Sequence, residues 1–240
     1  IDAAMRLECR DDTVICEALT VNGCALLDVL NANAPEGMAV RRTDNNVTLT
    51  CPLPDDTLDE DRRLKAVSVF DALRTLLNHI TALRSHPHAL FLGGVFAYDL
   101  LGTFEQLPQV EEGDNTCPDF VFYVAETLLT IDHKTRKTTV IGNVFSGEHV
   151  AQSYFFIAQR LEQIQQSLTD IPPFPVNNTG PGTDANVAVD QTDEQFKAHV
   201  NHLKSHILAG DIFQVVPSRT FSLCCPSPLL AYAHLKQQNP

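Results

Sequence analysis

The stretch that decides how the chain is organised runs from Thr192 to Leu223, TDEQFKAHVNHLKSHILAGDIFQVVPSRTFSL. Thr192 and Gln195 have the spacing of a capping box, in which each side chain satisfies a free N–H group at the start of a helix. Gly210 is placed to end that helix, because glycine adopts the left-handed conformation at little cost. Between them, apolar residues recur at helical spacing and form one stripe: Phe196, Val200, Leu203 and Ile207.

A largely buried strand is predicted directly after this helix. The run from Ile212 to Val216 is apolar except for one amide, Gln214. Burying a polar side chain without partners costs about 1–3 kcal/mol. Gln214 is therefore predicted to have hydrogen-bond partners.

Composition excludes several classes of partner. Of 240 residues, 44% are apolar, and 17 basic residues against 30 acidic ones give a formal charge of −13. Such an acidic surface argues against nucleic acid and anionic membrane as partners. The longest apolar run, residues 89–101, contains Asp99 and is shorter than the roughly 20 residues that span a bilayer. With no secretory leader pattern at Ile1, we expect a cytoplasmic protein.

The cysteines indicate reduced structural thiols. The seven are odd in number, contain no C-x-x-C pair and stand mostly in apolar, strand-like contexts. This usage agrees with an intracellular protein.

Periodicity predicts a mixture of helices and strands before residue 170. Thr57 to Arg84 is predicted to be one long helix, with a capping box at Thr57 and Glu60 and an apolar stripe. Paired glycines at Gly93 and Gly94 predict a strand whose backbone is closely approached, with a packed helix as the favoured neighbour. The other predicted elements are a hairpin of 5–10 and 13–19, a helix over 25–31, a strand over 47–51, a hairpin of 120–131 and 138–145, and a helix over 150–168.

A domain boundary is predicted where periodicity stops. Residues 171–190 hold four prolines and two glycines and have the composition of a linker. We predict a first domain over 1–175, a linker over 176–190 and the beginning of a second domain over 191–240. Ser227 and Pro228 are a natural N-cap and first residue of a final helix.

The residues by themselves do not compose a catalytic set. His199, His202 and His206 share one side of a helix, but a solvated flank is favoured over a metal site, since no further ligands have compatible spacing. No phosphate-binding glycine loop is present. The acidic residues at 55–61 are explained as the start of a helix. The residues indicate a soluble, acidic α+β protein.

Three strings resemble one family of enzymes. The string AGDIFQVVPSR at 209–219 resembles the motif that opens the chorismate-binding domain of chorismate-utilising enzymes. GGVFAYDLLGTFEQLP at 93–108 and NTCPDFVFYVAETLLTIDH at 115–133 are similar to component I of anthranilate synthase. These strings leave aminodeoxychorismate synthase component I open as an alternative.

The resemblance implies a fold and a reaction. The implied fold is α+β, with antiparallel β-sheets packed face to face and helices outside. Family members convert chorismate and ammonia to anthranilate and pyruvate; Mg²⁺ binds the substrate carboxylate, a glutamine amidotransferase (component II) supplies the ammonia, and tryptophan is the feedback inhibitor. Relatives that use water carry a lysine base at the position of Gln214, so Gln214 is implied to be a positioning group in the active site, with a buried structural amide as the alternative.

The resemblance also implies an incomplete protein. Arg74, Asn239 and Pro240 match positions associated with the family's effector pocket. The catalytic histidine and the magnesium-binding glutamates belong to the part of the family that follows residue 240, so no metal ligand is expected here and the piece is expected to be inactive. A non-catalytic module that senses an amino acid or docks a partner is the alternative. Self-association through an exposed edge at Phe213 to Val216 is also expected.

Overall fold

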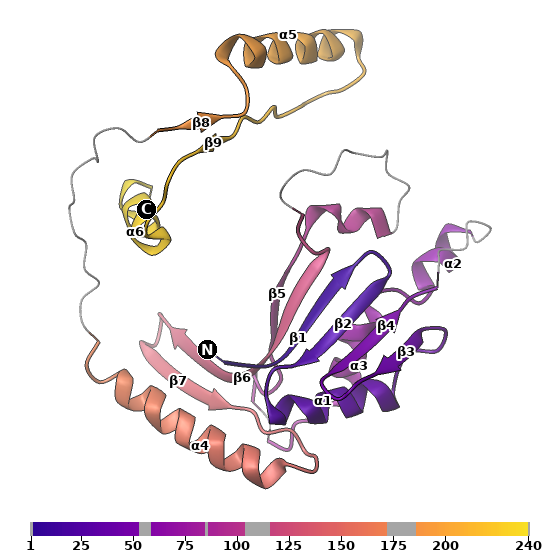
Figure 1. The fold of residues 1–240 in the computed structure, drawn as a ribbon, viewed down its shortest axis with the longest axis vertical. Helices are drawn as coiled ribbons and strands as arrows, with labels where there is room; N and C mark the ends of the chain where they lie inside the picture. The colour runs from indigo at the N-terminus through magenta and orange to yellow at the C-terminus, as the bar shows by residue number, and fades with distance from the viewer. Residues whose placement is uncertain (1, 53–58, 85, 104–115, 172–185, 240) are drawn as a thin grey trace. The chain divides into compact units, whose positions relative to one another are not determined.

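The computed structural model describes residues 2–52, 59–84, 86–103, 116–171 and 186–239 (Figure 1). The chain divides into two compact units, residues 1–171 and residues 172–240. Each unit is described by itself.

The first unit is built on a seven-stranded sheet in which every pairing is antiparallel. The strand order is β3-β4-β2-β1-β6-β5, and β7 pairs with the second half of β6. The strands are β1 (Asp2–Arg10), β2 (Thr13–Ala18), β3 (Ala39–Arg42), β4 (Asn46–Thr50), β5 (Leu92–Phe96), β6 (Phe120–Asp132) and β7 (Lys137–Gly142).

The described part of this unit also contains α-helices and one 3-10 helix. They are α1 (Val21–Ala32), α2 (Glu60–Lys65), α3 (Asp71–His79), a 3-10 helix η1 (Tyr98–Thr103) and α4 (Val150–Ser167). Helix α1 contacts strands β1, β2 and β4 and helix α3, and α4 contacts β6 and β7 (Figure 1). The core lies between the sheet and α1 and α3, and its fully buried members include Leu7, Leu26, Leu30, Leu49 and Leu76.

Both predicted hairpins are confirmed. In the β1–β2 hairpin, Asp11 adopts a left-handed conformation with φ of 52° in the turn. In the β6–β7 hairpin, the Asp132 carboxylate accepts hydrogen bonds from the backbone N–H groups of Lys134 at 2.9 Å and Thr135 at 3.2 Å. The predictions of helices near residues 25–31 and 150–168 and of a strand near 47–51 are also confirmed.

The prediction of one helix from Thr57 to Arg84 is wrong. Helix α2 ends at Lys65 and α3 begins at Asp71, while Thr57 lies outside the described residues. The Asp71 carboxylate accepts a hydrogen bond of 2.7 Å from the Ser68 N–H group, and this turn separates the two helices. The local side-chain bond competes with a continuous helix, which periodicity does not register.

The close approach predicted at the paired glycines is real, but its source is a strand. An added Cβ at Gly94 would lie 2.2 Å from the carbonyl oxygen of Val121 and 2.6 Å from the ring of Phe122, both in the neighbouring strand β6. The expected helix neighbour is therefore corrected. Glycine is needed here because β5 lies very close to β6.

The second unit contains α5 (Asp193–Ala209), α6 (Pro228–Gln238) and a two-residue ladder between β8 (Ala188–Val189) and β9 (Phe221–Ser222). Both bonds of the capping box between Thr192 and Gln195 are present, and Gly210 ends α5 in the left-handed conformation with φ of 84°. Ser227 caps α6 and Pro228 is its first residue. These three local predictions are confirmed.

The prediction of a buried strand over Ile212 to Val216 is wrong. The run forms neither strand nor helix, and the side chains of Phe213 and Val216 are 101% and 79% exposed. Within the described part of the second unit, the only ladder joins β8 and β9, so no sheet is present for this run to join. An apolar run becomes a buried strand only where neighbouring strands pair with it and cover it.

The α+β class with an antiparallel sheet is confirmed. Face-to-face packing of two sheets and the domain limits 1–175, 176–190 and 191–240 stay predictions, and much of the predicted linker lies outside the described residues. Across the described ranges, no helix is long and apolar enough to cross a membrane.

Candidate functional site

The candidate site residues come from three places in the fold. The signature segment, defined as residues 209–219, leaves the C-terminus of α5 and leads toward β9. Its far end is anchored: Arg219 Nη1 donates to Asp193 Oδ1 at 2.6 Å, and the Arg219 guanidinium lies 4.9 Å from the centre of the Phe221 ring. The hydrogen bond from Arg219 lowers the pKa of the Asp193 carboxyl. This pair joins the first turn of α5 to the end of the segment.

Gln214 lies in the middle of the signature segment and is exposed. The alternative of a buried structural amide is therefore wrong in this structure. The backbone at Gln214 is held at one end by the Gly210 turn and at the other by the Arg219–Asp193 ion pair. The amide is presented to the surroundings and is free of the desolvation cost that the buried prediction carried.

Arg74 lies on the exposed side of α3, opposite the buried residues Leu73 and Leu76. Its guanidinium donates to Asp71 Oδ1 at 2.9 Å, one turn back on the same helix, and lies 5.9 Å from the centre of the Phe70 ring. An exposed pair of this kind contributes roughly 0–1 kcal/mol to stability. The Arg74 guanidinium is thus oriented by its neighbours but remains accessible to solvent.

Asn239 and Pro240 stand at the end of α6. The Asn239 backbone N–H donates to the Leu235 carbonyl at 2.9 Å and so caps the helix, and the side chain is exposed. Pro240 lies outside the described residues. Arg74 belongs to the first unit and Asn239 to the second, so the structure does not bring them together in one unit.

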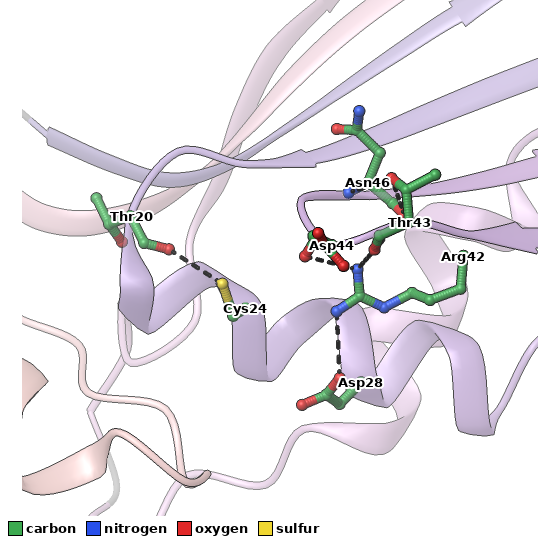
Figure 2. Close-up of polar contacts among 7 residues, drawn as sticks. All are labelled: Thr20, Cys24, Asp28, Arg42, Thr43, Asp44 and Asn46. Atoms are coloured by element: carbon green, nitrogen blue, oxygen red, sulfur yellow. Dashed lines mark hydrogen bonds and ion pairs between the residues drawn. The ribbon is translucent and has the colours of Figure 1, made fainter.

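A polar cleft of about 480 Å³ lies in the first unit, between the first turns of α1, the β3–β4 turn and the start of α4. Arg42 crosses it: its guanidinium lies 3.4 Å from Asp28 Oδ1 and donates to the carbonyl oxygens of Thr43, Asp44 and Asn46 (Figure 2). Residues of α4's start, including His149, line the other side. The sequence offered no motif for this cleft, because its residues meet only after folding.

Beneath the cleft, one polar network ties α1 to the sheet. Asn22 Nδ2 donates to the Asn143 carbonyl at 2.9 Å and to Glu126 Oε1 at 3.1 Å, and the Phe145 N–H donates to Asn22 Oδ1 at 2.8 Å. The Thr20 hydroxyl donates to the same Glu126 oxygen at 2.7 Å. Each of these buried or half-buried groups is satisfied, so the network rigidifies this corner.

A second cavity of about 710 Å³ is lined by residues of α1 and by the chain that follows α3. Its lining is mainly apolar, with Leu26, Val29, Ile80, Leu90 and Tyr154 among its members, and it includes the side chains of Arg84 and His79. Neither cavity's lining includes Arg74. The predicted effector residue Arg74 therefore lies outside the linings of these two cavities.

Three thiols are held neutral by burial. Desolvation raises the pKa of Cys9 and Cys16 to about 12 and that of Cys51 to about 11. A neutral buried thiol is a poor nucleophile and a poor metal ligand. The prediction of structural thiols agrees with the free state of the cysteines in the described residues.

Comparison with known proteins identifies the family. The family described as chorismate binding enzyme matches residues 39–240. The chain belongs to this family. The predicted site residues Arg74, Gln214, Asn239 and Pro240 all fall within the matched range.

The chain is similar to several proteins that carry the same name. The chain is 42% identical over 241 residues to a protein named anthranilate synthase component 1 from Escherichia coli (strain K12), and 44% identical over 240 residues to one of the same name from Serratia marcescens. Each comparison covers 100% of this chain and 45% of the relative. The chain thus spans less than half the length of these relatives.

A solved structure supports the fold. The crystal structure of anthranilate synthase component I from Streptococcus pneumoniae TIGR4 matches with a TM-score of 0.57 at 17% identity, covering 100% of this chain and 44% of that one. At this identity the likeness concerns the fold. It supports the α+β fold with an antiparallel sheet and helices.

Proposed function

We propose that the chain is part of the chorismate-binding subunit of an anthranilate synthase, which converts chorismate and ammonia to anthranilate and pyruvate in tryptophan biosynthesis. The observation that carries the proposal is 42–44% identity over the whole chain to several proteins named anthranilate synthase component 1. Because the chain spans 45% of those relatives, the activity is proposed for a longer protein. The 240 residues alone are expected to be inactive.

Magnesium is the proposed cofactor of that longer protein, where it would neutralise and orient the anionic substrate. Mg²⁺ demands oxygen ligands in near-octahedral geometry. No three His, Cys, Asp or Glu side chains gather closely enough to hold a metal ion within the part of the chain that the structure describes. The proposed ligands belong to the part of the relatives that follows residue 240.

Gln214 is the proposed positioning residue for ammonia. Its exposure, on a segment fixed at both ends, leaves the amide available to an active site completed by other residues. An amide cannot act as a general base at neutral pH, which favours ammonia over water as the nucleophile. Arg74, Asn239 and Pro240 are the proposed contacts to the tryptophan effector. A glutamine amidotransferase is the proposed partner, and the cytoplasm is the proposed location of the protein.

The test is product analysis on a protein that extends these residues to the full length of the relatives. With chorismate, ammonium and Mg²⁺, we expect anthranilate as the product, and glutamine should replace ammonium only when the amidotransferase is added. Formation of aminodeoxychorismate instead would overturn the proposal in favour of aminodeoxychorismate synthase. Absence of turnover with retained tryptophan binding would identify an amino-acid-sensing module.

Gln214→Lys in the same protein tests the residue assignment. A lysine at this position could activate water, so the ratio of hydroxylated to aminated product should rise while tryptophan inhibition is unchanged. Gln214→Glu serves as the matched control of similar volume. Unchanged product ratios and rates in both variants would show that Gln214 does not face the reacting ring.

A further inference from the structure

The last two turns of α5 bring two of the histidines that share one helix side into direct contact through their imidazole rings. His202 and His206 are four residues apart, and such residues are neighbours on one helix face. Their rings meet edge to face, with centroids 4.8 Å apart and planes at 85°. The two Nε2 atoms lie 3.4 Å from each other.

We propose that His202 and His206 form a binding site for a divalent transition metal ion of tetrahedral preference, Zn²⁺ being the best match. Two nitrogen ligands at 2.0–2.1 Å from a tetrahedral zinc ion are roughly 3.3–3.4 Å apart, which is the chord of the tetrahedral angle. Ligands at right angles on an octahedral ion would be closer, at about 2.9 Å. The observed separation of 3.4 Å fits the tetrahedral ion.

A carboxylate behind one ring prepares that ring for a metal. His206 Nδ1 lies 2.8 Å from Asp211 Oδ2 and donates to it, which leaves the lone pair of His206 on Nε2, the atom nearest to His202. A histidine that ligates a metal almost always has such an outer hydrogen bond, which orients the ring and raises its basicity.

The turn that ends α5 places this carboxylate. Gly210, in the left-handed conformation, reverses the chain so that the Asp211 N–H donates to the His206 carbonyl at 3.0 Å. Asp211 is thereby held beside His206 although it lies beyond the end of the helix. The glycine stop and the outer ligand are one structural unit.

The site supplies two protein ligands, and water would complete the coordination. In the described ranges, no third His, Cys, Asp or Glu side chain joins the pair to make a metal group. His202 is exposed and His206 is half-buried, with its side chain 42% exposed, so a hydrated ion can reach both rings without an opening of the fold. The net charge of −13 favours the approach of cations. A two-ligand site exchanges its metal more readily than a four-ligand structural site.

Binding there would link two successive turns of the helix. A metal ion can bridge His202 and His206 only when the helix is formed, so metal binding stabilises the folded helix by mass action. The helix should therefore resist thermal unwinding better when Zn²⁺ is present. This expectation gives a readout that does not depend on any enzymatic activity.

The experiment is a Zn²⁺ titration of the whole 240-residue chain without a histidine tag. The exposed thiols also bind zinc, so Cys117, Cys224 and Cys225 are first replaced by serine. Calorimetry measures the affinity, and imidazole resonances in NMR spectra report which rings are bound. The His202 and His206 resonances should shift together in slow or intermediate exchange.

Two substitutions on the same helix separate the pair from ordinary histidines. His202→Ala should lower the Zn²⁺ affinity by at least about tenfold, since one of two ligands is lost. His199→Ala is the matched control, because that ring contacts Gln191 Oε1 at 3.0 Å instead of another histidine, and it should change the affinity less than about twofold. Asp211→Asn, which weakens the outer hydrogen bond, should cost about tenfold.

The proposal fails if His202→Ala and the parent chain bind Zn²⁺ equally well, or if the His202 and His206 resonances do not move. Either result would show that the two rings are a solvated flank joined by an N–H···N hydrogen bond. Circular dichroism of each variant confirms that α5 is still formed. The exposed position of His202 makes loss of folding an unsuitable explanation for a changed affinity of the His202→Ala variant.

Discussion

Replacing Gly23 by alanine tests how closely α1 packs on the sheet. An added Cβ at this position would lie 2.0 Å from the Ala4 carbonyl oxygen and 2.9 Å from the Ala4 carbonyl carbon. Both separations are below 3.0 Å, a distance that real Cβ atoms essentially never reach. The atoms in the way belong to the backbone of β1, so no side-chain rotation can relieve the clash. The helix must instead withdraw by about one ångström.

The expected cost exceeds the gain in helix propensity. Alanine is favoured over glycine inside a helix by about 1 kcal/mol. Against this, overpacking costs about 1–3 kcal/mol and occasionally more. The Ala4 carbonyl also accepts a hydrogen bond of 2.8 Å from the Leu19 N–H, and losing it costs about 0.5–1.5 kcal/mol. Withdrawal of α1 further loosens the buried Leu26 and Leu30. A net destabilisation of about 2–3 kcal/mol follows.

Urea denaturation followed by circular dichroism measures this loss. Gly23→Ala should lower the midpoint with an unchanged m-value, because stability changes without a change in the surface exposed. Asn31→Ala, on the exposed side of the same helix, is the matched control and should leave the midpoint equal or slightly higher. A Gly23→Ala protein as stable as the parent would refute the close approach of α1 to β1.

Three further predictions follow from buried and exposed groups. Burial raises the pKa of the Cys16 thiol from 9.0 to about 12, so the thiol of the unfolded chain ionises first. The free energy of unfolding should therefore fall between these pH values by about 1.4 kcal/mol per pH unit. Cys16→Ala should remove this pH dependence in urea titrations at several pH values, and an equal pH dependence in both proteins would contradict the burial. Asn22→Ala should destabilise the fold by about 2–4 kcal/mol, because it leaves the Asn143 carbonyl and the Phe145 N–H without their shared partner; a loss below about 1 kcal/mol in the same urea assay would disprove the role of this network. Phe213→Ser should leave the unfolding midpoint unchanged, since the ring is 101% exposed, and should weaken the self-association that sedimentation detects across a concentration series; a marked loss of stability would show that the ring is buried.

Some features of the candidate site depend on residues close in the sequence, and others depend on long-range packing. The position of the signature segment could be predicted from its sequence motif. One of its anchors, the Gly210 turn, lies within the segment, and the other is the ion pair between Arg219 and Asp193. The exposure of Gln214 could not be predicted, because it depends on which strands are present to cover the run. The return of the Asp211 backbone to His206 follows from the Gly210 stop, because the N–H group after a left-handed glycine bonds to the carbonyl five residues back.

The sequence by itself determined the features whose partners lie within a few residues. The capping box of Thr192 and Gln195, the Gly210 stop and the Ser227 cap each satisfy hydrogen bonds locally, so they form wherever these residues stand together. The β6–β7 hairpin belongs to the same class, because its turn is closed by Asp132.

Only the tertiary structure decided the features that depend on distant groups. The sequence placed Gly23 before a helix, whereas the fold places it inside α1 with the Ala4 backbone against it. The long apolar stripe from 57 to 84 became two helices, and the apolar run at 212–216 stayed uncovered. The hydrophobic effect is non-directional and depends only on the apolar area removed from water. Sequence periodicity therefore identifies the apolar residues, whereas the packing of the whole unit decides which surface covers them.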